Sequence, residues 1–158
     1  MSDDEILGLI SKVFPRRSAS GFNVFDYVHA EGSPAIALLY ARLCWPEFAE
    51  FEDMVFLKES VEDDDDRARI RQALDKNEGD RTKTEQAFNC LDFEEIFGSR
   101  VGDTTVRESL LLAQRLREMW QAKLERTWPS TQFKVEIVQS EPNEESIALQ
   151  FWRERTPQ

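Results

Sequence analysis

Cysteine and histidine are scarce in this chain of 158 residues, which has two cysteines and one histidine. The cysteines, Cys44 and Cys90, do not make the disulfide framework of a small secreted domain, and nothing marks an oxidising compartment. With His29 as the lone imidazole, they also argue against a structural zinc site. We therefore expect a cytoplasmic protein without a bound metal ion.

Long apolar runs and the common nucleotide-binding motifs are missing as well. The longest apolar run falls far short of the ~20 residues that a membrane-spanning helix needs, and the N-terminus carries acids where a secretory signal carries bases. There is no P-loop, no Gly-x-Gly-x-x-Gly and no Gly-x-Ser-x-Gly elbow. The sequence thus predicts no membrane partner and no cofactor, and binding is expected rather than catalysis.

What the chain does have is acidity, and it is unevenly placed. Residues 1–66 contain 15 of the 31 acids but only 5 of the 20 bases, whereas residues 67–158 are almost neutral. The acidity is densest in residues 62–66, which read Glu-Asp-Asp-Asp-Asp. A surface field of one sign repels nucleic acid and anionic lipid and steers basic partners. We therefore expect no nucleic-acid partner and a basic protein partner.

The composition otherwise indicates one folded domain over residues 1–158. Hydrophobic residues make up 41% of the chain, with 11 Phe and 4 Trp, which is too many for a disordered acidic chain. A chain of this length can also bury a sizeable core without help from a second domain.

Local patterns predict most of the secondary structure. Ser2 and Glu5 have the spacing of a capping box, which predicts a helix that ends at Pro15. Aromatic and β-branched residues at 21–28 predict a strand, and the apolar stretch 35–44 predicts a helix at the centre of the core. Further expected elements are a strand at 54–57, helices at 67–77 and 82–90 with more helical turns to 97, and a long helix near 105–127.

Alternating apolar residues at 133–137 and 147–151 predict a C-terminal β-hairpin. The fold class is therefore α+β: a small antiparallel or mixed sheet of three or four strands, covered by several helices. Trp120 lies on the apolar stripe of the long helix and is expected in the core. Trp152 is the best candidate for an exposed or interface aromatic, unless the sheet is buried on both faces.

The charge pattern favours a non-catalytic binding protein that captures a basic partner. Inhibitors and immunity proteins of bacterial toxins have this general character, but the analogy is one of type, and no motif identifies a family. The acids could equally serve only to keep the protein in solution. The expected contact residues are Glu50, Glu52, Asp53, Glu62, Asp63, Asp64, Asp65 and Asp66.

A small enzyme or ligand-binding domain with a pocket near His29 is the alternative. Its candidate residues are Tyr27, His29, Glu31 and Arg42, because Arg42 interrupts an otherwise apolar helix and could clamp an anion. The sequence also leaves a homodimer open, since an exposed edge of the hairpin could pair two copies.

Overall fold

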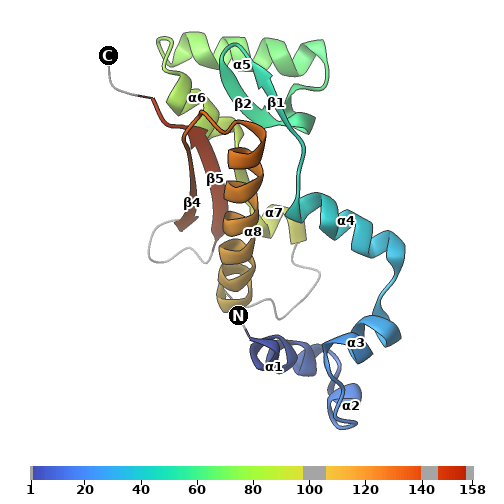
Figure 1. The fold of residues 1–158 in the computed structure, drawn as a ribbon. Helices are drawn as coiled ribbons and strands as arrows, with labels where there is room; N and C mark the ends of the chain where they lie inside the picture. The colour runs from blue at the N-terminus through green and yellow to red at the C-terminus, as the bar shows by residue number, and fades with distance from the viewer. Residues whose placement is uncertain (1, 98–105, 140–145, 156–158) are drawn as a thin grey trace. The chain divides into compact units, whose positions relative to one another are not determined.

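The computed structural model describes residues 2–97, 106–139 and 146–155 of the chain (Figure 1). It divides into two compact units, Met1–Arg42 and Leu43–Gln158, called here the N-terminal and the C-terminal unit. Each unit is described by itself, and the single domain expected from the length stays a prediction.

The N-terminal unit is helical. It contains α1 (Asp3–Val13), α2 (Pro15–Ser18), α3 (Val24–Glu31) and most of α4 (Pro34–Cys44). The capping box at the start of α1 is confirmed: the Ser2 hydroxyl accepts from Glu5 N, and the Glu5 carboxylate accepts from Ser2 N. The buried ring of Tyr27 lies 5.4 Å from that of Phe22 and 6.2 Å from that of Phe14, between ring centroids.

Two predictions for this unit are wrong. The expected strand at 21–28 is instead α3, because Asn23 and Asp26 form a capping box that starts a helix. The helix expected at 35–44 is present as α4, but it does not lie at the centre of the core: Leu38 is 72% exposed and Leu39 is 68% exposed. Its apolar composition predicted burial, and the exposed fractions show that composition alone does not produce it.

The C-terminal unit holds all the strands of the described structure. They form a two-stranded sheet, β1 (Phe48–Phe51) with β2 (Met54–Leu57), and a three-stranded sheet in the order β3-β5-β4, both antiparallel. The strands of the second sheet are β3 (Cys90–Asp92), β4 (Phe133–Gln139) and β5 (Ile147–Arg153). Its helices are η1 (Lys58–Val61), α5 (Asp64–Lys76), α6 (Arg81–Phe88), α7 (Phe93–Phe97) and α8 (Val106–Thr127).

This architecture confirms the α+β class, the C-terminal hairpin and the long helix, of which residue 105 lies outside the described residues. The strand at 54–57 is confirmed too, but its partner β1 was not expected. Glu52 and Asp53 join the two strands with φ angles of 52° and 60°, the positive values that a tight two-residue hairpin turn needs. The helix expected to reach residue 90 ends at Phe88, and the turns expected from 91 begin with β3 instead.

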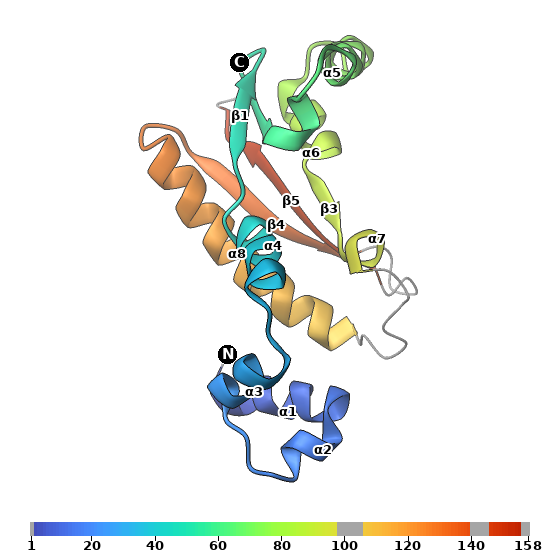
Figure 2. The ribbon, with the colours of Figure 1, turned by 90° about the vertical axis from the view of Figure 1, so that its right-hand side faces the viewer.

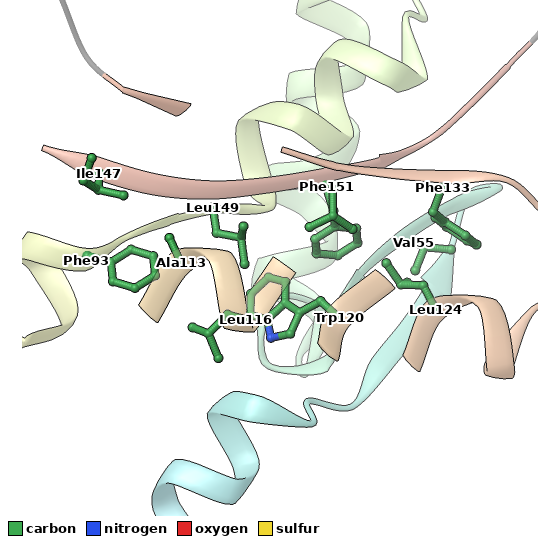
Figure 3. Close-up of a cluster of buried hydrophobic side chains, with 11 residues drawn as sticks. Val55, Phe93, Ala113, Leu116, Trp120, Leu124, Phe133, Ile147, Leu149 and Phe151 are labelled. Carbon is green, nitrogen blue, oxygen red and sulfur yellow. The ribbon is translucent and has the colours of Figure 1, made fainter. Parts of the chain in front are cut away.

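The core of this unit lies between α8 and one face of the three-stranded sheet. Figure 3 shows Ile147, Leu149 and Phe151 of β5 pointing toward α8. The side chains that they meet there include Ala113, Leu116, Trp120 and Leu124, all buried. Trp120 is 1% exposed, as expected of a core residue, and its indole N–H donates to Leu43 O at 2.9 Å. The aromatic core thus fixes the sheet against the helix.

The opposite face of β5 is covered as well. Trp152 is 8% exposed, so the expectation of an exposed aromatic is wrong, and the alternative of a sheet buried on both faces explains its position. The side-chain amide of Gln150, which also lies on this face, donates to Gln86 O of α6 at 2.7 Å. The views in Figures 1 and 2 place α6 beside β5 accordingly.

Candidate functional site

Two buried side chains from the end of α6 join the two sheets. Glu85 and Asn89 are both fully buried, and they lie one helical turn apart. The Glu85 carboxylate accepts from Val55 N at 2.7 Å, and the Asn89 amide donates to Val55 O at 2.7 Å. Together they satisfy both backbone groups of Val55, the second residue of β2.

The same two side chains also bind the free edge of β5. Glu85 accepts from Arg153 N at 3.0 Å, and Asn89 donates to Phe151 O at 3.3 Å. β3 pairs with this edge of β5 only from Cys90 onward, so Glu85 and Asn89 occupy the place where β3 would otherwise continue. Side chains thus replace a strand between β2 and β5, and they keep buried backbone groups hydrogen-bonded.

The charge of Glu85 is neutralised by Arg155, whose guanidinium lies 2.5 Å from the carboxylate. A buried carboxylate is tolerated only when it is paired and hydrogen-bonded, and Glu85 has two backbone donors besides the arginine. Arg155 in turn donates to Asp53 O at 2.7 Å. Glu85, Asn89, Arg153 and Arg155 thus form one set of contacts, called here the joint between the two sheets. The joint extends to the tip of the β1–β2 hairpin.

The three acids of the hairpin are engaged within the chain. Arg153 bonds Asp53 at 2.7 Å and Glu50 at 2.8 Å, and its side chain is mostly buried. Glu52 pairs with Arg71 of α5 at 3.0 Å, and its carbonyl oxygen accepts from Arg81 at 3.1 Å. Glu50, Glu52 and Asp53, expected to contact a partner, thus help to hold the hairpin in place.

The acids at 62–66 lie at the start of α5. Asp63 is the N-cap and accepts from Asp66 N at 2.9 Å, while Asp66 pairs with Arg69 and Asp64 with Arg67. Acids in the first turn are favourable because the N-terminus of a helix is its positive end. Glu62, Asp64 and Asp65 remain on the surface, with the Asp64 side chain 99% exposed.

A groove with a volume of about 570 Å³ runs between β1 and the first half of α5. Its lining combines an apolar part with charges of both signs. The lining residues are Ala49, Glu50, Phe51, Lys58, Val61, Glu62, Asp64, Arg67 and Arg71. The three bases are partly neutralised, since Lys58 pairs with Glu47, Arg67 with Asp64 and Arg71 with Glu52. The groove therefore brings Glu50, Glu62 and Asp64 together around an apolar floor.

The residues of the ligand-binding alternative lie on α3 and α4. Tyr27 is buried in the aromatic cluster of the N-terminal unit, and His29 is exposed on α3 rather than at a strand end. Glu31 pairs with Arg17 at 2.9 Å. Arg42 lies partly buried near the end of α4.

The described residues offer little reactive chemistry. Cys44 and Cys90 are free thiols, and burial raises the pKa of both; the nearby carboxylates of Asp92 and Glu95 raise that of Cys90 further. A raised pKa keeps a thiol protonated and poorly nucleophilic. In the described ranges, no three His, Cys, Asp or Glu side chains lie close enough to hold a metal ion. Nor does any helix of those ranges have the length and apolarity to cross a bilayer.

Sequence reasoning missed the joint made by Glu85, Asn89, Arg153 and Arg155. Nothing in the local pattern separates Glu85 from the other acids, and Arg155 lies 70 residues along the chain. Comparisons with protein-family models, curated proteins and solved structures found no match to this chain. Its function is therefore argued from its own residues.

Proposed function

We propose that this protein is a non-catalytic binding protein that captures a basic segment of a protein partner in the groove between β1 and α5. The observation that carries the proposal is the lining of that groove, where Phe51, Ala49 and Val61 form an apolar floor beside the exposed carboxylates of Glu62 and Asp64. A segment with an apolar anchor and basic neighbours is complementary to this lining.

We propose a smaller contact set than the eight acids expected from the sequence. Glu50, Glu52, Asp53, Asp63 and Asp66 already have partners inside the chain, so they contribute to the field more than to direct contacts. Asp64 pairs with Arg67, but its side chain is 99% exposed, so we propose that it meets the partner together with the exposed Glu62 and Asp65. Exposed charges of this kind mainly raise the association rate, and their effect is screened by salt.

The test is a pull-down from a lysate of the source organism at low and high salt, with the bound proteins identified by mass spectrometry. The test variant is Glu62→Gln/Asp64→Asn/Asp65→Asn. The control variant, Glu94→Gln/Glu95→Gln/Glu154→Gln, changes the net charge equally at exposed positions away from the groove. A third variant, Phe51→Ala, removes the aromatic part of the floor.

The expected result is one basic protein that is retained at low salt and weakened at high salt. Binding of this protein should be lost in the Glu62/Asp64/Asp65 triple variant and in Phe51→Ala. The Glu94/Glu95/Glu154 control variant should retain it. Equal loss with both triples would show that only net charge matters, and the groove would then not be the binding site. Blank lanes at both salt concentrations would refute capture of a basic partner.

A further inference from the structure

Strand β4 forms one margin of the three-stranded sheet (Figure 1), and no described strand pairs with its outer side. Along β4, residues whose backbone groups bond β5 alternate with residues whose backbone groups point away from it. Glu154 N donates to Gln132 O at 2.9 Å, so Lys134, Glu136 and Val138 are the residues that direct their backbone groups toward β5. The backbone groups of Phe133, Val135 and Ile137 therefore point outward. Gln121 confirms this direction, since its side chain donates to Phe133 O from α8 at 3.1 Å.

A hollow of about 370 Å³ lies between Val135 of β4 and residues of α8. It is lined by Arg117, Glu118, Gln121, Ala122, Glu125 and Val135. A strand added at the open edge would place the side chain opposite Val135 on the same face of the sheet, and thus in this hollow. The edge and the hollow together have the form of a docking site for one more strand.

We propose that the outer edge of β4 pairs with β4 of a second copy of this chain, antiparallel, with Val135 opposite the partner's Val135. In this register Lys134 lies opposite the partner's Glu136, and Glu136 lies opposite the partner's Lys134. The two-fold symmetry thus adds two cross-strand ion pairs to the Lys134–Glu136 pair that is already present within each strand. Opposite charges at facing positions stabilise strand pairs, and like charges destabilise them.

Two features of β4 set this register: the charges of Lys134 and Glu136, and the backbone groups that point away from β5. Shifting the centre to Glu136 would place that carboxylate against its own copy, which is unfavourable. With Val135 at the centre, Phe133 faces the partner's Ile137, so the outward backbone groups of Phe133, Val135 and Ile137 find partners, while Gln139, the fourth outward-pointing residue of β4, lies beyond the paired segment. Phe133 O can accept from the second copy and from Gln121 together, because a carbonyl oxygen has two lone pairs.

The charged residues of α8 that line the hollow are compatible with the same two-fold symmetry. The wall of the hollow carries Arg117 and Glu118 toward one end, where Glu118 is paired with Arg115 at 2.8 Å, and Glu125 toward the other. An antiparallel copy reverses this order, so opposite charges are presented across the two-fold axis. The joined sheet would run β3-β5-β4-β4-β5-β3 and would leave neither copy with an open β4 edge.

Sedimentation equilibrium of the full chain tests the proposal with charge reversals. Lys134→Glu and Glu136→Lys, each alone, place like charges opposite each other and should raise the dimer Kd about tenfold or more. Mixing the two single variants restores both ion pairs and should give a heterodimer. The double variant Lys134→Glu/Glu136→Lys keeps the wild-type composition and should dimerise like the wild type.

Val135→Pro is a second test, because it removes an outward N–H that makes no bond to β5. It should abolish the dimer, and tryptophan fluorescence shows whether the C-terminal unit is still folded. A wild-type chain that is monomeric at every concentration would overturn the proposal. So would a dimer that tolerates the single reversals, which would mean another interface, or a failure of the mixed variants to associate, which would exclude this register.

Discussion

The N-terminal and C-terminal units differ in what happens to their apolar side chains. In the C-terminal unit, α8 buries Leu116, Trp120 and Leu124 against β5. In the N-terminal unit, Tyr27 is the one fully buried hydrophobic residue of the described part, and α4 leaves Leu38 and Leu39 largely exposed. Apolar content alone therefore does not decide which helix becomes core; a matching surface elsewhere in the chain does.

The two units can be followed separately in solution. All four tryptophans, Trp45, Trp120, Trp128 and Trp152, belong to the C-terminal unit, whereas both tyrosines, Tyr27 and Tyr40, belong to the N-terminal unit. Tryptophan fluorescence therefore reports unfolding of the C-terminal unit, and tyrosine absorbance reports the N-terminal unit. The first two of the following predictions concern the C-terminal unit and use tryptophan fluorescence for this reason.

The largest effect is expected at the buried joint of the C-terminal unit. Glu85→Ala removes the carboxylate that accepts from Val55 N and Arg153 N and pairs with Arg155, and removing one partner of a buried ion pair costs about 3–5 kcal/mol of unfolding free energy. Urea unfolding followed by tryptophan fluorescence measures it. The control Glu94→Ala, at an exposed acid of α7, should change stability by less than about 0.5 kcal/mol. A loss below about 1 kcal/mol for Glu85→Ala would mean that the joint does not hold the sheets together.

A smaller, pH-dependent effect is expected at Asp92, which caps α7. Burial alone would raise the pKa of Asp92, but hydrogen bonds from the Ser146 hydroxyl and from Glu94 N and Glu95 N outweigh it and lower that pKa. Its stabilisation is therefore complete above the unfolded-state pKa of about 3.9 and is lost as the pH falls through the lower folded-state pKa.

Asp92→Ala should accordingly cost about 1 kcal/mol at neutral pH and progressively less in acid. Urea unfolding by tryptophan fluorescence, repeated over a series of pH values from neutral to acid, gives the comparison with the wild type. An equal cost at every pH would show that the charged form of Asp92 contributes nothing.

The smallest effect is expected on α4. Leu39→Ser changes a side chain that is 68% exposed, so the unfolding free energy should shift by no more than about 0.5 kcal/mol. The matched variant Leu116→Ser, in the buried stripe of α8, should cost several kcal/mol, as removal of a buried leucine does (about 2–5 kcal/mol for Leu→Ala). Unfolding followed by far-ultraviolet circular dichroism covers both sites. A large cost at Leu39 would show that α4 is covered in solution and that the two units are more alike than described.

The sequence predicted the elements whose signals are local and agree with one another. The period of α8, the alternation of β4 and β5 and the capping box at Ser2 all lead directly to the observed structure. The segment at 21–28 was misread because its aromatic and β-branched residues favour a strand, while Asn23 and Asp26 start a helix. Here two polar residues outweigh the propensity of their neighbours.

The site could be predicted only in part. The acids of residues 62–66 are visible in the sequence, and so is their favourable place before a helix. The partners of Glu50 and Asp53 were not predictable, because Arg153 lies about a hundred residues further along the chain. Burial of Glu85 likewise depends on β2 and β5 meeting at the end of α6, which no local pattern records.

The joint between the two sheets determines where the β1–β2 hairpin attaches to β5. A backbone ladder is a repeat, and a strand can slip along it by two residues without losing its pattern of bonds. Glu85 and Asn89 instead offer one acceptor and one donor, spaced to fit a single residue, Val55. A hairpin shifted by one residue would turn the adjacent backbone groups toward β1, so Glu85 and Asn89 would lose their bonds to β2 while keeping those to β5.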